Sequence, residues 1–429
     1  MMKGRLRVLP WAATVALCAL AIPATASASG MSWVSNSAPV GADKSCASPG
    51  FSSVQAALEA APSGGKINVC GGTYVEQVQV TKPAKIALAS GSGTARLVMP
   101  ETPSESTTSC DTAVPGGQTD EISVCTTGKV SIKGLTIEAL APIATCLGAL
   151  NGINVGGGAE LNASSDTIIG ASTTLDADKG CQKGIAVLVG SHKAAVVGHA
   201  TLKNDTISSY EKNGPTVVGA GSTMKMINTT VTGEGPSPWI AQNGVEVAFG
   251  GKGMVKGSTI SGNECEIPGI CSSTELGNQA DGVLFYQAAA GSGVSGSSIS
   301  DNDLGVYYSS GSATEPSSSQ VKIAENTLSD NRYEGILLEE GKATITSDTI
   351  TGGGELGIAI LQASFQESGS ESSANKSTIE GMSVAAVGVL TEGPGPAGTF
   401  TIKNSSISKN ASEVSNSSPN FTVVKKNDS

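Results

Sequence analysis

Charged and aromatic residues are scarce in this chain of 429 residues. Charged residues make up 15 % of it and aromatic residues 3 %. A coiled coil or a long helical bundle needs far more charge, so both classes are excluded. Lys and Arg number 26 against 37 Asp and Glu, and this acidic balance argues against a nucleic-acid binder. Disorder is also excluded, because 39 % of the residues are hydrophobic and short apolar runs continue to the end of the chain.

Long hydrophobic runs are missing too, apart from one near the N-terminus. Three basic residues up to Arg7 precede an apolar run from Trp11 to Ile22, and small residues follow through Ala28. This order is typical of a secretory signal peptide, and about a dozen apolar residues are too few to span a bilayer comfortably. We therefore expect a signal peptide at residues 1–28, a secreted, extracellular protein, and no membrane span in the mature chain.

Two short patterns alternate along the rest of the sequence. The first is a Gly followed by alternating apolar residues, and its nine copies begin at Gly152, Gly184, Gly214, Gly244, Gly282, Gly305, Gly335, Gly357 and Gly388. The second is a hydroxyl residue before an aliphatic one, as at Thr259-Ile260 and Ser298-Ile299. The Gly copies recur every 30 residues or so, about the length of a solenoid repeat. Each unit holds about three short strands and no room for a helix, which predicts stacked units around a continuous core.

Asparagines follow the second pattern in four units, at Asn263, Asn302, Asn331 and Asn410. Asn tolerates the left-handed backbone conformation that a sharp corner needs, and its amide can bond to a stacked copy of itself. We therefore interpret these asparagines as corner residues.

The alternation within the Gly-led strands predicts which side chains face outward. Residues one and three after each Gly should face the core, and residues two and four after it should face solvent. The predicted outward column contains Glu246, Leu284 with Tyr286, Tyr307 with Ser309, Leu337 with Glu339, and Ala359 with Leu361.

The two ends of the chain differ from the repeats. Ser52 or Ser53 can cap a short helix with apolar residues from Val54 to Ala61 on one face, and such a helix would cover the first exposed end of the solenoid. The last residues, 412–429, are interpreted as a polar tail with one strand at 421–424.

Position within the repeats suggests how eight of the nine cysteines pair, since Cys18 lies in the predicted signal peptide. An even number in an exported chain predicts disulfides, and no Cys-x-x-Cys spacing or histidine cluster indicates a metal site. Cys146 and Cys181 each precede a Gly-led strand, so stacking would place them at the same corner of successive units. We predict the pairs Cys46–Cys70, Cys110–Cys125, Cys146–Cys181 and Cys265–Cys271.

Four segments near the start carry a family resemblance: Ser53-Val54-Gln55-Ala56-Ala57-Leu58, Gly65-Lys66-Ile67-Asn68-Val69-Cys70, Gly72-Thr73-Tyr74-Val75-Glu76 and Thr81-Lys82-Pro83. They closely resemble the opening of right-handed parallel β-helix proteins of the pectin-lyase-like superfamily, and the later repeats are similar to its generic coils. The resemblance covers about residues 46–410. It implies an all-β, single-stranded right-handed parallel β-helix of about ten rungs over residues 29–411, with a capping helix. The superfamily includes polysaccharide lyases, hydrolases and non-enzymatic surface proteins, and the catalytic segments of its pectin enzymes are absent here.

Tyr286 and Tyr307 are the predicted substrate-binding residues, because both lie in the outward column of neighbouring Gly-led strands. Two exposed aromatic rings side by side would form a platform for stacking a sugar. Packing under a loop such as 310–319 is an equal alternative.

Four acidic residues in the same region are the candidate catalytic groups: Asp281, Asp303, Glu334 and Glu339. Glycoside hydrolysis needs two carboxylates roughly 5 to 9.5 Å apart, which Asp281 and Asp303 could satisfy from adjacent rungs. Glu246 and Glu339 are three rungs, about 14 Å, apart and therefore too distant. A lyase would need a basic residue, for which Lys212 and Arg332 are nearest. Ordinary solvated turn charges are the alternative.

We therefore expect a secreted protein that binds an extracellular polysaccharide and, if it is an enzyme, acts as a polysaccharide lyase or glycoside hydrolase. The alternative is a non-catalytic surface adhesion or scaffold protein. No cofactor is expected, because the Gly-rich stretches lie between strands and open no helix. Calcium at outward carboxylates stays open, although no ligand loop of fixed spacing is visible. The sequence makes no prediction of oligomeric state.

Overall fold

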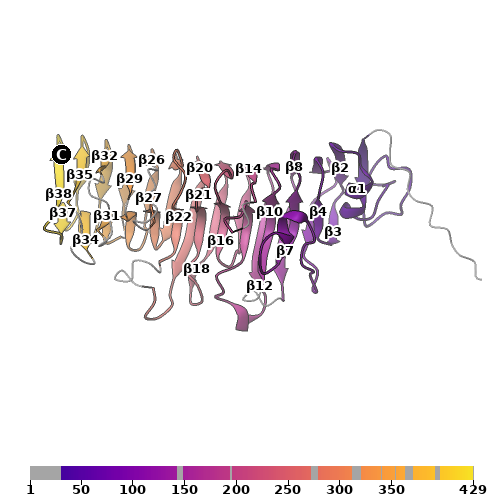
Figure 1. Cartoon of the computed structure of the whole chain (residues 1–429), viewed down its shortest axis with the longest axis horizontal. Coiled ribbons are helices and arrows are strands. Elements are labelled where there is room, and N and C mark those ends of the chain that lie inside the picture. Colours follow the sequence, from indigo (N-terminus) through magenta and orange to yellow (C-terminus); the bar gives the residue numbers. More distant parts are fainter. Residues whose placement is uncertain are drawn as a thin grey trace, which may run out of the picture.

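Each coil of the chain contributes one short strand to each of three long parallel sheets, and the coils stack into an elongated parallel β-helix (Figure 1). The computed structural model describes residues 30–142, 148–193, 196–271, 279–311, 320–339, 341–352, 354–362, 371–391 and 397–428. The predicted signal peptide, residues 1–28, lies outside these ranges. None of the helices in the described ranges is long and apolar enough to cross a membrane.

The sheets are named first, second and third in the order in which each coil passes through them. Within the described residues, the first sheet contains β1 (Met31–Val34), β2 (Gly65–Val69), β5 (Ala84–Leu88), β8 (Lys129–Lys133), β11 (Glu160–Ser164), β14 (His199–Lys203), β17 (Thr223–Ile227), β20 (Lys252–Lys256), β23 (Gly293–Ser295), β26 (Gln320–Ala324), β29 (Lys342–Thr346), β32 (Glu371–Asn375), β35 (Gly398–Lys403) and β38 (Phe421–Lys426).

The second sheet contains the strands that begin with a hydroxyl residue and those that precede them in the stack: β3 (Gly72–Val75), β6 (Ala95–Val98), β9 (Thr136–Ala141), β12 (Thr167–Thr173), β15 (Thr206–Ser208), β18 (Thr230–Ser237), β21 (Thr259–Cys265), β24 (Ser298–Asn302), β27 (Thr327–Ser329), β30 (Thr349–Thr351), β33 (Thr378–Glu380) and β36 (Ser406–Ser408).

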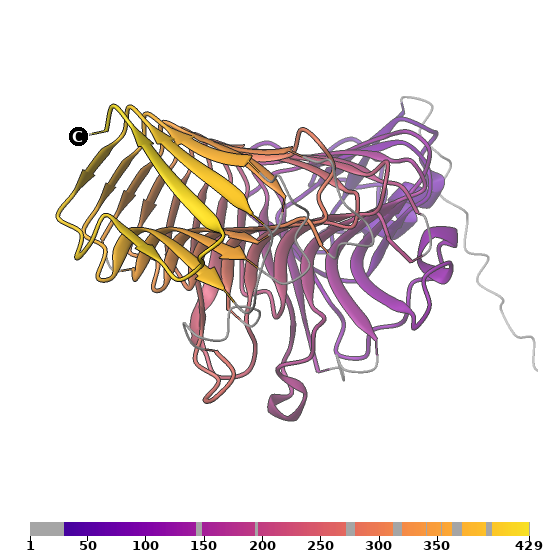
Figure 2. The ribbon, with the colours of Figure 1, turned by 60° about the vertical axis from the view of Figure 1, so that its left-hand side comes forward.

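The third sheet contains the nine Gly-led strands and three others, β4, β7 and β37, that lack the leading Gly: β4 (Val78–Val80), β7 (Gln118–Cys125), β10 (Ala149–Gly156), β13 (Ile185–Val189), β16 (Asn213–Val218), β19 (Asn243–Ala248), β22 (Asp281–Tyr286), β25 (Leu304–Ser309), β28 (Glu334–Glu339), β31 (Leu356–Gln362), β34 (Ala385–Thr391) and β37 (Val414–Asn416). Figure 2 looks obliquely along the stack, with strands of successive coils behind one another and loops of the middle coils projecting from one side.

The described strands form twelve coils, somewhat more than the ten or so rungs predicted. Coils before Gly152 lack the Gly-led pattern, so the repeat count did not include them. The segment predicted as a polar tail completes the last coil with β37, which pairs with β34, and adds β38, which pairs with β35 and contains the predicted strand at 421–424.

The core is the predicted stack of inward aliphatic side chains. Val283, Phe285, Val306 and Ile336 are fully buried in one cluster that runs through the coils. The Gly that opens these strands is required sterically: a Cβ at Gly282 would lie 2.7 Å from the carbonyl oxygen of Gly305 in the next coil. This close approach explains why the repeat is marked by glycine.

Two of the nine Gly-led units are displaced by two residues from the predicted register. Ile185 pairs with Asn151, so Ala186 rather than Gly184 stands opposite Gly152. Near the end of the stack, the backbone oxygen of Ala386 lies 2.7 Å from the Cβ position of Gly357, so Ala386 stands opposite Gly357. Gly388 pairs with Ala359 instead. Alanine, the next smallest residue, thus replaces glycine at the tight position in these two coils.

The asparagine corners differ from the prediction in one respect. Asn263 donates to the side-chain oxygen of Asn302 at 2.8 Å, and Asn302 donates to Asn331 at 2.9 Å, so the expected stacking is present. The left-handed conformation belongs to the residue before each Asn, such as Asp301 and Asp330, both with φ of +55°. Asn263, Asn302 and Asn331 are buried, and their amides bond backbone and neighbouring side chains inside the corner, whereas Asn410 is half-buried.

The N-terminal end is closed by α1 (Val54–Ala60). Ser53 caps it by accepting from the Ala56 amide, and the buried residues Val54, Ala57 and Leu58 pack on the first coil, as predicted. The structure contains the disulfides Cys46–Cys70, Cys110–Cys125 and Cys265–Cys271, which are three of the four predicted pairs. The fourth, Cys146–Cys181, involves Cys146, which lies outside the described residues, and it stays a prediction.

Candidate functional site

A pocket of about 370 Å³ lies on the outer face of the third sheet. Its floor is one outward column of four neighbouring strands, in which Asn154 pairs with Leu188, Leu188 with Thr216, and Thr216 with Glu246. We call it the third-sheet pocket. The sheet positions this floor rigidly, because each strand is hydrogen-bonded on both sides.

Aromatic rings form one edge of the third-sheet pocket. His192 and Phe249 both line it, and their rings stack with centroids 4.6 Å apart and planes 25° apart. Phe249 also meets the edge of Tyr286, with centroids 5.4 Å apart and an interplanar angle of 77°. A run of three rings therefore follows the ends of the third-sheet strands.

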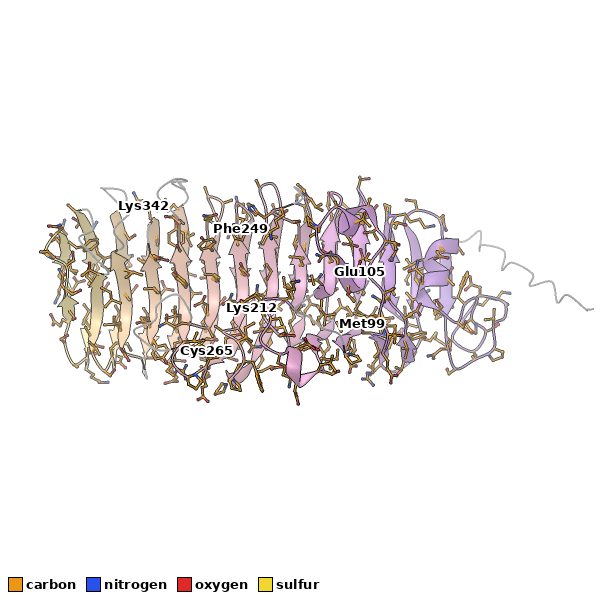
Figure 3. All side chains as sticks on the ribbon, turned by 60° about the horizontal axis from the view of Figure 1, so that its bottom comes forward. Met99, Glu105, Lys212, Phe249, Cys265 and Lys342 are labelled. Atoms are coloured by element: carbon orange, nitrogen blue, oxygen red, sulfur yellow. A yellow bond between two sulfur atoms is a disulfide. The ribbon has the colours of Figure 1, made fainter. Side chains whose placement is uncertain are left out.

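Phe249 is held in an unusual conformation. Its φ is +51°, in the left-handed region that bulky residues rarely adopt, and its side chain is 36 % exposed. Such strain persists only where surrounding structure imposes it, and it is concentrated at functional sites. Figure 3 labels Phe249 and Lys212, which lie beyond opposite ends of the third-sheet strands.

A carboxyl pair lies at the N-terminal end of the pocket. Asp111, in the short helix α2 (Ser109–Thr112), accepts from the Thr108 hydroxyl at 2.5 Å and from the Asn154 amide at 2.6 Å. Asp120 accepts from Asn151 at 2.7 Å. Burial, followed by the charge of Asp111, raises the pKa of Asp120 well above its usual range. The Cys110–Cys125 disulfide ties α2 to the third sheet beside this pair.

Glu246 lines the opposite end of the pocket. Its Oε2 accepts from the Asn213 amide, and burial raises its pKa, an effect that the nearby Lys212 partly offsets. Lys212 is itself buried next to Glu246 and Asp281, and its ammonium group donates to the Ala241 carbonyl at 2.5 Å. Burial lowers the pKa of Lys212.

Three of the four predicted catalytic acids gather where the chain enters the third sheet. Leu304 pairs with Asp281 on one side and with Glu334 on the other, and Asp303 directly precedes it. Burial raises the pKa of Asp281 well above its usual range and that of Glu334 to about 8. Each of these two carboxyls has one buried oxygen without a hydrogen-bond partner. The structure therefore brings together buried carboxyls with raised pKa values that come from separate strands.

Asp303 differs from these two because its Oδ1, which also lacks a hydrogen-bond partner of good geometry, has a cation beside it. It forms an ion pair with Arg332 at 2.5 Å and accepts from the backbone amides of Cys265 and Ala280, both at 3.0 Å. Burial raises its pKa to about 6, although Arg332 and these amides act in the opposite direction. Its contacts fix the corner between β21 and β22.

The fourth acid, Glu339, lies at the other end of the strands. It accepts a hydrogen bond from the Tyr307 hydroxyl, and burial raises the pKa of Tyr307. Tyr286 and Tyr307 share the outer face of adjacent strands, but Tyr286 is opposite Ser309 and Tyr307 is opposite Leu284. The two rings are thus diagonal neighbours. Tyr286 continues the aromatic edge of the pocket, whereas Tyr307 packs against the C-terminal coils.

The outward column does not face solvent in those coils, contrary to prediction. Leu337, Ala359 and Leu361 have at most 2 % of their surface exposed. They form a second apolar cluster with Leu304 and Leu356, against which Tyr307 packs. Alternation predicts the side of the sheet correctly, but it contains no information on what covers that side.

Sequence reasoning missed His192, Phe249, Asp111 and Asp120. Phe249 lies just beyond the end of its Gly-led strand, as a turn residue, so the alternation rule did not reach it. An aromatic residue directly before Gly250-Gly251 was the available signal. In the described part of the chain, no three His, Cys, Asp or Glu side chains are placed to hold a metal ion.

Comparisons with known proteins agree with this architecture. Residues 194–368 match the family described as right handed beta helix region. The chain has a right-handed parallel β-helix fold. No curated protein matches the sequence.

Three solved structures share the fold at low sequence identity. The periplasmic alginate epimerase AlgG is 10 % identical, with a TM-score of 0.54, over 83 % of this chain and 78 % of that one. The catalytic domain of a GH87 α-1,3-glucanase in complex with nigerose is 13 % identical, with a TM-score of 0.53, over 87 % and 66 %. XylC in complex with xylose is 11 % identical, with a TM-score of 0.50, over 92 % and 86 %. At these identities the likeness establishes the fold alone.

Proposed function

We propose that the protein is a secreted carbohydrate-active β-helix protein that binds a polysaccharide along the outer face of its third sheet and cleaves or modifies it there. The observation that carries the proposal is the third-sheet pocket: a hydrogen-bonding floor, an edge of stacked rings, and buried carboxyls with raised pKa values close by. Sugars are recognised by this combination of an apolar ring face and several polar groups.

Three similar folds support the substrate class. Their printed names describe an alginate epimerase, an α-1,3-glucanase with bound nigerose, and a protein with bound xylose. Extracellular location is supported by the signal-like segment at residues 1–28 and by three disulfides, which form and persist in oxidising compartments.

Carboxyls with raised pKa values suit the role of general acid. A carboxylic acid with a raised pKa can donate a proton to the oxygen of a glycosidic bond as that bond breaks. Asp281 and Glu334 are the stronger of the four candidates, because their carboxyls have oxygens without partners, whereas Asp303 is paired with Arg332 and Glu339 with Tyr307. Lys212, with its lowered pKa, is the base that a lyase reaction would use.

A screen of the mature protein on a glycan array tests the proposal, followed by reducing-sugar and 235-nm assays of each ligand that binds. Hydrolysis would release reducing ends, and a lyase would give unsaturated products that absorb at 235 nm. We expect Asp281→Asn and Glu334→Gln to lower product formation while binding persists.

A non-catalytic role in adhesion is the second candidate, and the engagement of Asp303 and Glu339 in internal contacts favours it. Binding without product would support a lectin-like role. No binding to any glycan would contradict the proposed function and favour a scaffold.

A further inference from the structure

We infer that the third-sheet pocket is a subsite for an uncharged sugar unit, with the sugar ring against Phe249 and its hydroxyls bonded to Asn154, Thr216 and Glu246. The inference rests on the proposed function and specifies its substrate class. The volume of the third-sheet pocket, about 370 Å³, falls at the lower end of the range for small-molecule sites, about 300–1,000 Å³.

The aromatic edge provides the apolar surface for the sugar ring. Phe249 is stacked on His192, which also lines the pocket, and it contacts Tyr286 in an edge-to-face arrangement. Supported in this way, Phe249 keeps a partly exposed face at the pocket despite its strained backbone. A large exposed ring in a left-handed conformation is otherwise unfavourable, so a ligand contact accounts for its placement.

The floor offers both acceptors and donors. The amide nitrogen of Asn154 already donates to Asp111, which leaves its carbonyl oxygen as an acceptor. Glu246 uses one oxygen to accept from Asn213, which leaves the other for a ligand. Burial raises the pKa of Glu246, and in its protonated form this carboxyl can also donate. Sugar hydroxyl groups can both donate and accept hydrogen bonds, so they fit a floor that offers both kinds of group.

The side chains around the pocket disfavour an acidic sugar. Asp111 lies behind Asn154, and Glu246 closes the other end of the floor. Among the described lining residues there is no arginine, the side chain best suited to bind a carboxylate in a bidentate manner. Lys193 also lines the pocket, but its side chain is exposed, so its charge is screened by water. A uronate would thus bring its carboxylate next to buried acids.

Calorimetric titration with two sets of oligosaccharides of equal length tests the inference. One set is neutral, with gluco- and xylo-oligosaccharides, and the other consists of oligouronates from pectate and alginate. We expect a neutral oligosaccharide to bind at least tenfold more tightly than any oligouronate. Equal or tighter binding of the oligouronates would overturn the inference and leave the proposed function intact.

Variants then locate the binding. Phe249→Ala should lower the affinity for the neutral oligosaccharide about tenfold. Glu246→Ala should lower this affinity more than Glu246→Gln does, because the amide of Gln can still donate. Met254→Ala is the matched control, because Met254 is an apolar side chain of similar exposure, 39 %, on the first sheet. Unchanged affinity of Phe249→Ala, in a variant that keeps its melting temperature, would place the ligand elsewhere and refute the subsite. Failure of every glycan to bind the wild type would contradict both proposals.

Discussion

The ring of His192 stacks on that of Phe249 even though one strand of the third sheet, β16, lies between their coils. The turn after β16 makes this possible, because it carries Gly219 with φ of +86°. A Cβ at Gly219 would lie 2.8 Å from the backbone oxygen of Ser191. The absence of a side chain there lets the segment that carries His192 lie across the intervening coil and complete the aromatic edge of the pocket.

Gly219→Ala should therefore separate the two rings. We expect a loss of about 1–2 kcal/mol of stability from the left-handed backbone and the contact with Ser191, together with weaker glycan binding. Gly91→Ala is the matched control, because Gly91 also has a positive φ, +73°, but nothing within 4 Å of its Cβ position. Thermal denaturation and titration of both variants measure the two effects. Equal glycan affinity in both variants would show that His192 does not support the ligand site.

Ile336→Asp tests the register of the core. Ile336 is fully buried between Val306 and Ile358 of the adjacent strands, so an aspartate there would bury an unpaired carboxylate and cost more than about 4 kcal/mol. Lys322→Asp, at an exposed position of β26, should change stability little. Chemical denaturation gives both values, and unchanged stability of Ile336→Asp would invalidate the alternation on which the fold assignment depends.

Asn302→Ala tests the asparagine stack. Asn302 is fully buried, donates to Asn331 and accepts from Asn263, so its removal leaves two buried amides short of a partner. We expect a loss of about 2–3 kcal/mol. Asn404 makes a similar bond to Asn375 on the exposed surface, and Asn404→Ala should cost well below 1 kcal/mol. Similar losses in the two variants would show that burial of the stack contributes nothing.

Buried carboxyls with raised pKa values make the stability of the folded protein fall as the pH rises. The pKa of Glu334 is raised to about 8 and that of Asp166 to about 7, both chiefly by burial. The folded state then binds more protons than the unfolded state above about pH 4.5, so stability is greatest below that pH and falls as the pH rises to about 8. Melting temperatures between pH 4 and 9 should show this decline.

Glu334→Gln removes one titrating group and should flatten that decline by up to a few kcal/mol of unfolding free energy. Glu101→Gln, at an exposed position, should leave the profile unchanged. A wild-type stability that rises from pH 5 to pH 8 would contradict the burial of neutral acids.

The fold could be predicted because its determinants are local and repeated. Glycine marks the position where adjacent coils approach most closely, and alternation marks the core, as Val306 and Ile336 show. The exceptions have a physical reason: Ala186 and Ala386 are small enough to substitute for glycine, so the visible glycines in those coils are not at the tight position.

The site was harder to predict because it depends on contacts between coils and on what covers the sheet. Asp281 and Asp303 were predicted to lie on adjacent rungs, and Glu334 in the same region, since the repeat fixes their coil. Burial of Leu337 and the bond between Tyr307 and Glu339 could not be derived from alternation. Phe249 and His192 were missed because turn geometry, rather than strand periodicity, brings them together.

The central claim is that a carbohydrate binds the outer face of the third sheet, and hydrogen–deuterium exchange with the tightest-binding glycan tests it directly. We predict slower exchange in residues 185–193, 213–218 and 243–250, which contribute the floor and edge of the pocket. The first-sheet strands of the same region, β17 and β20, should exchange at the same rate with and without ligand. Protection confined to the first or second sheet, or no protection with a bound glycan, would contradict the claim.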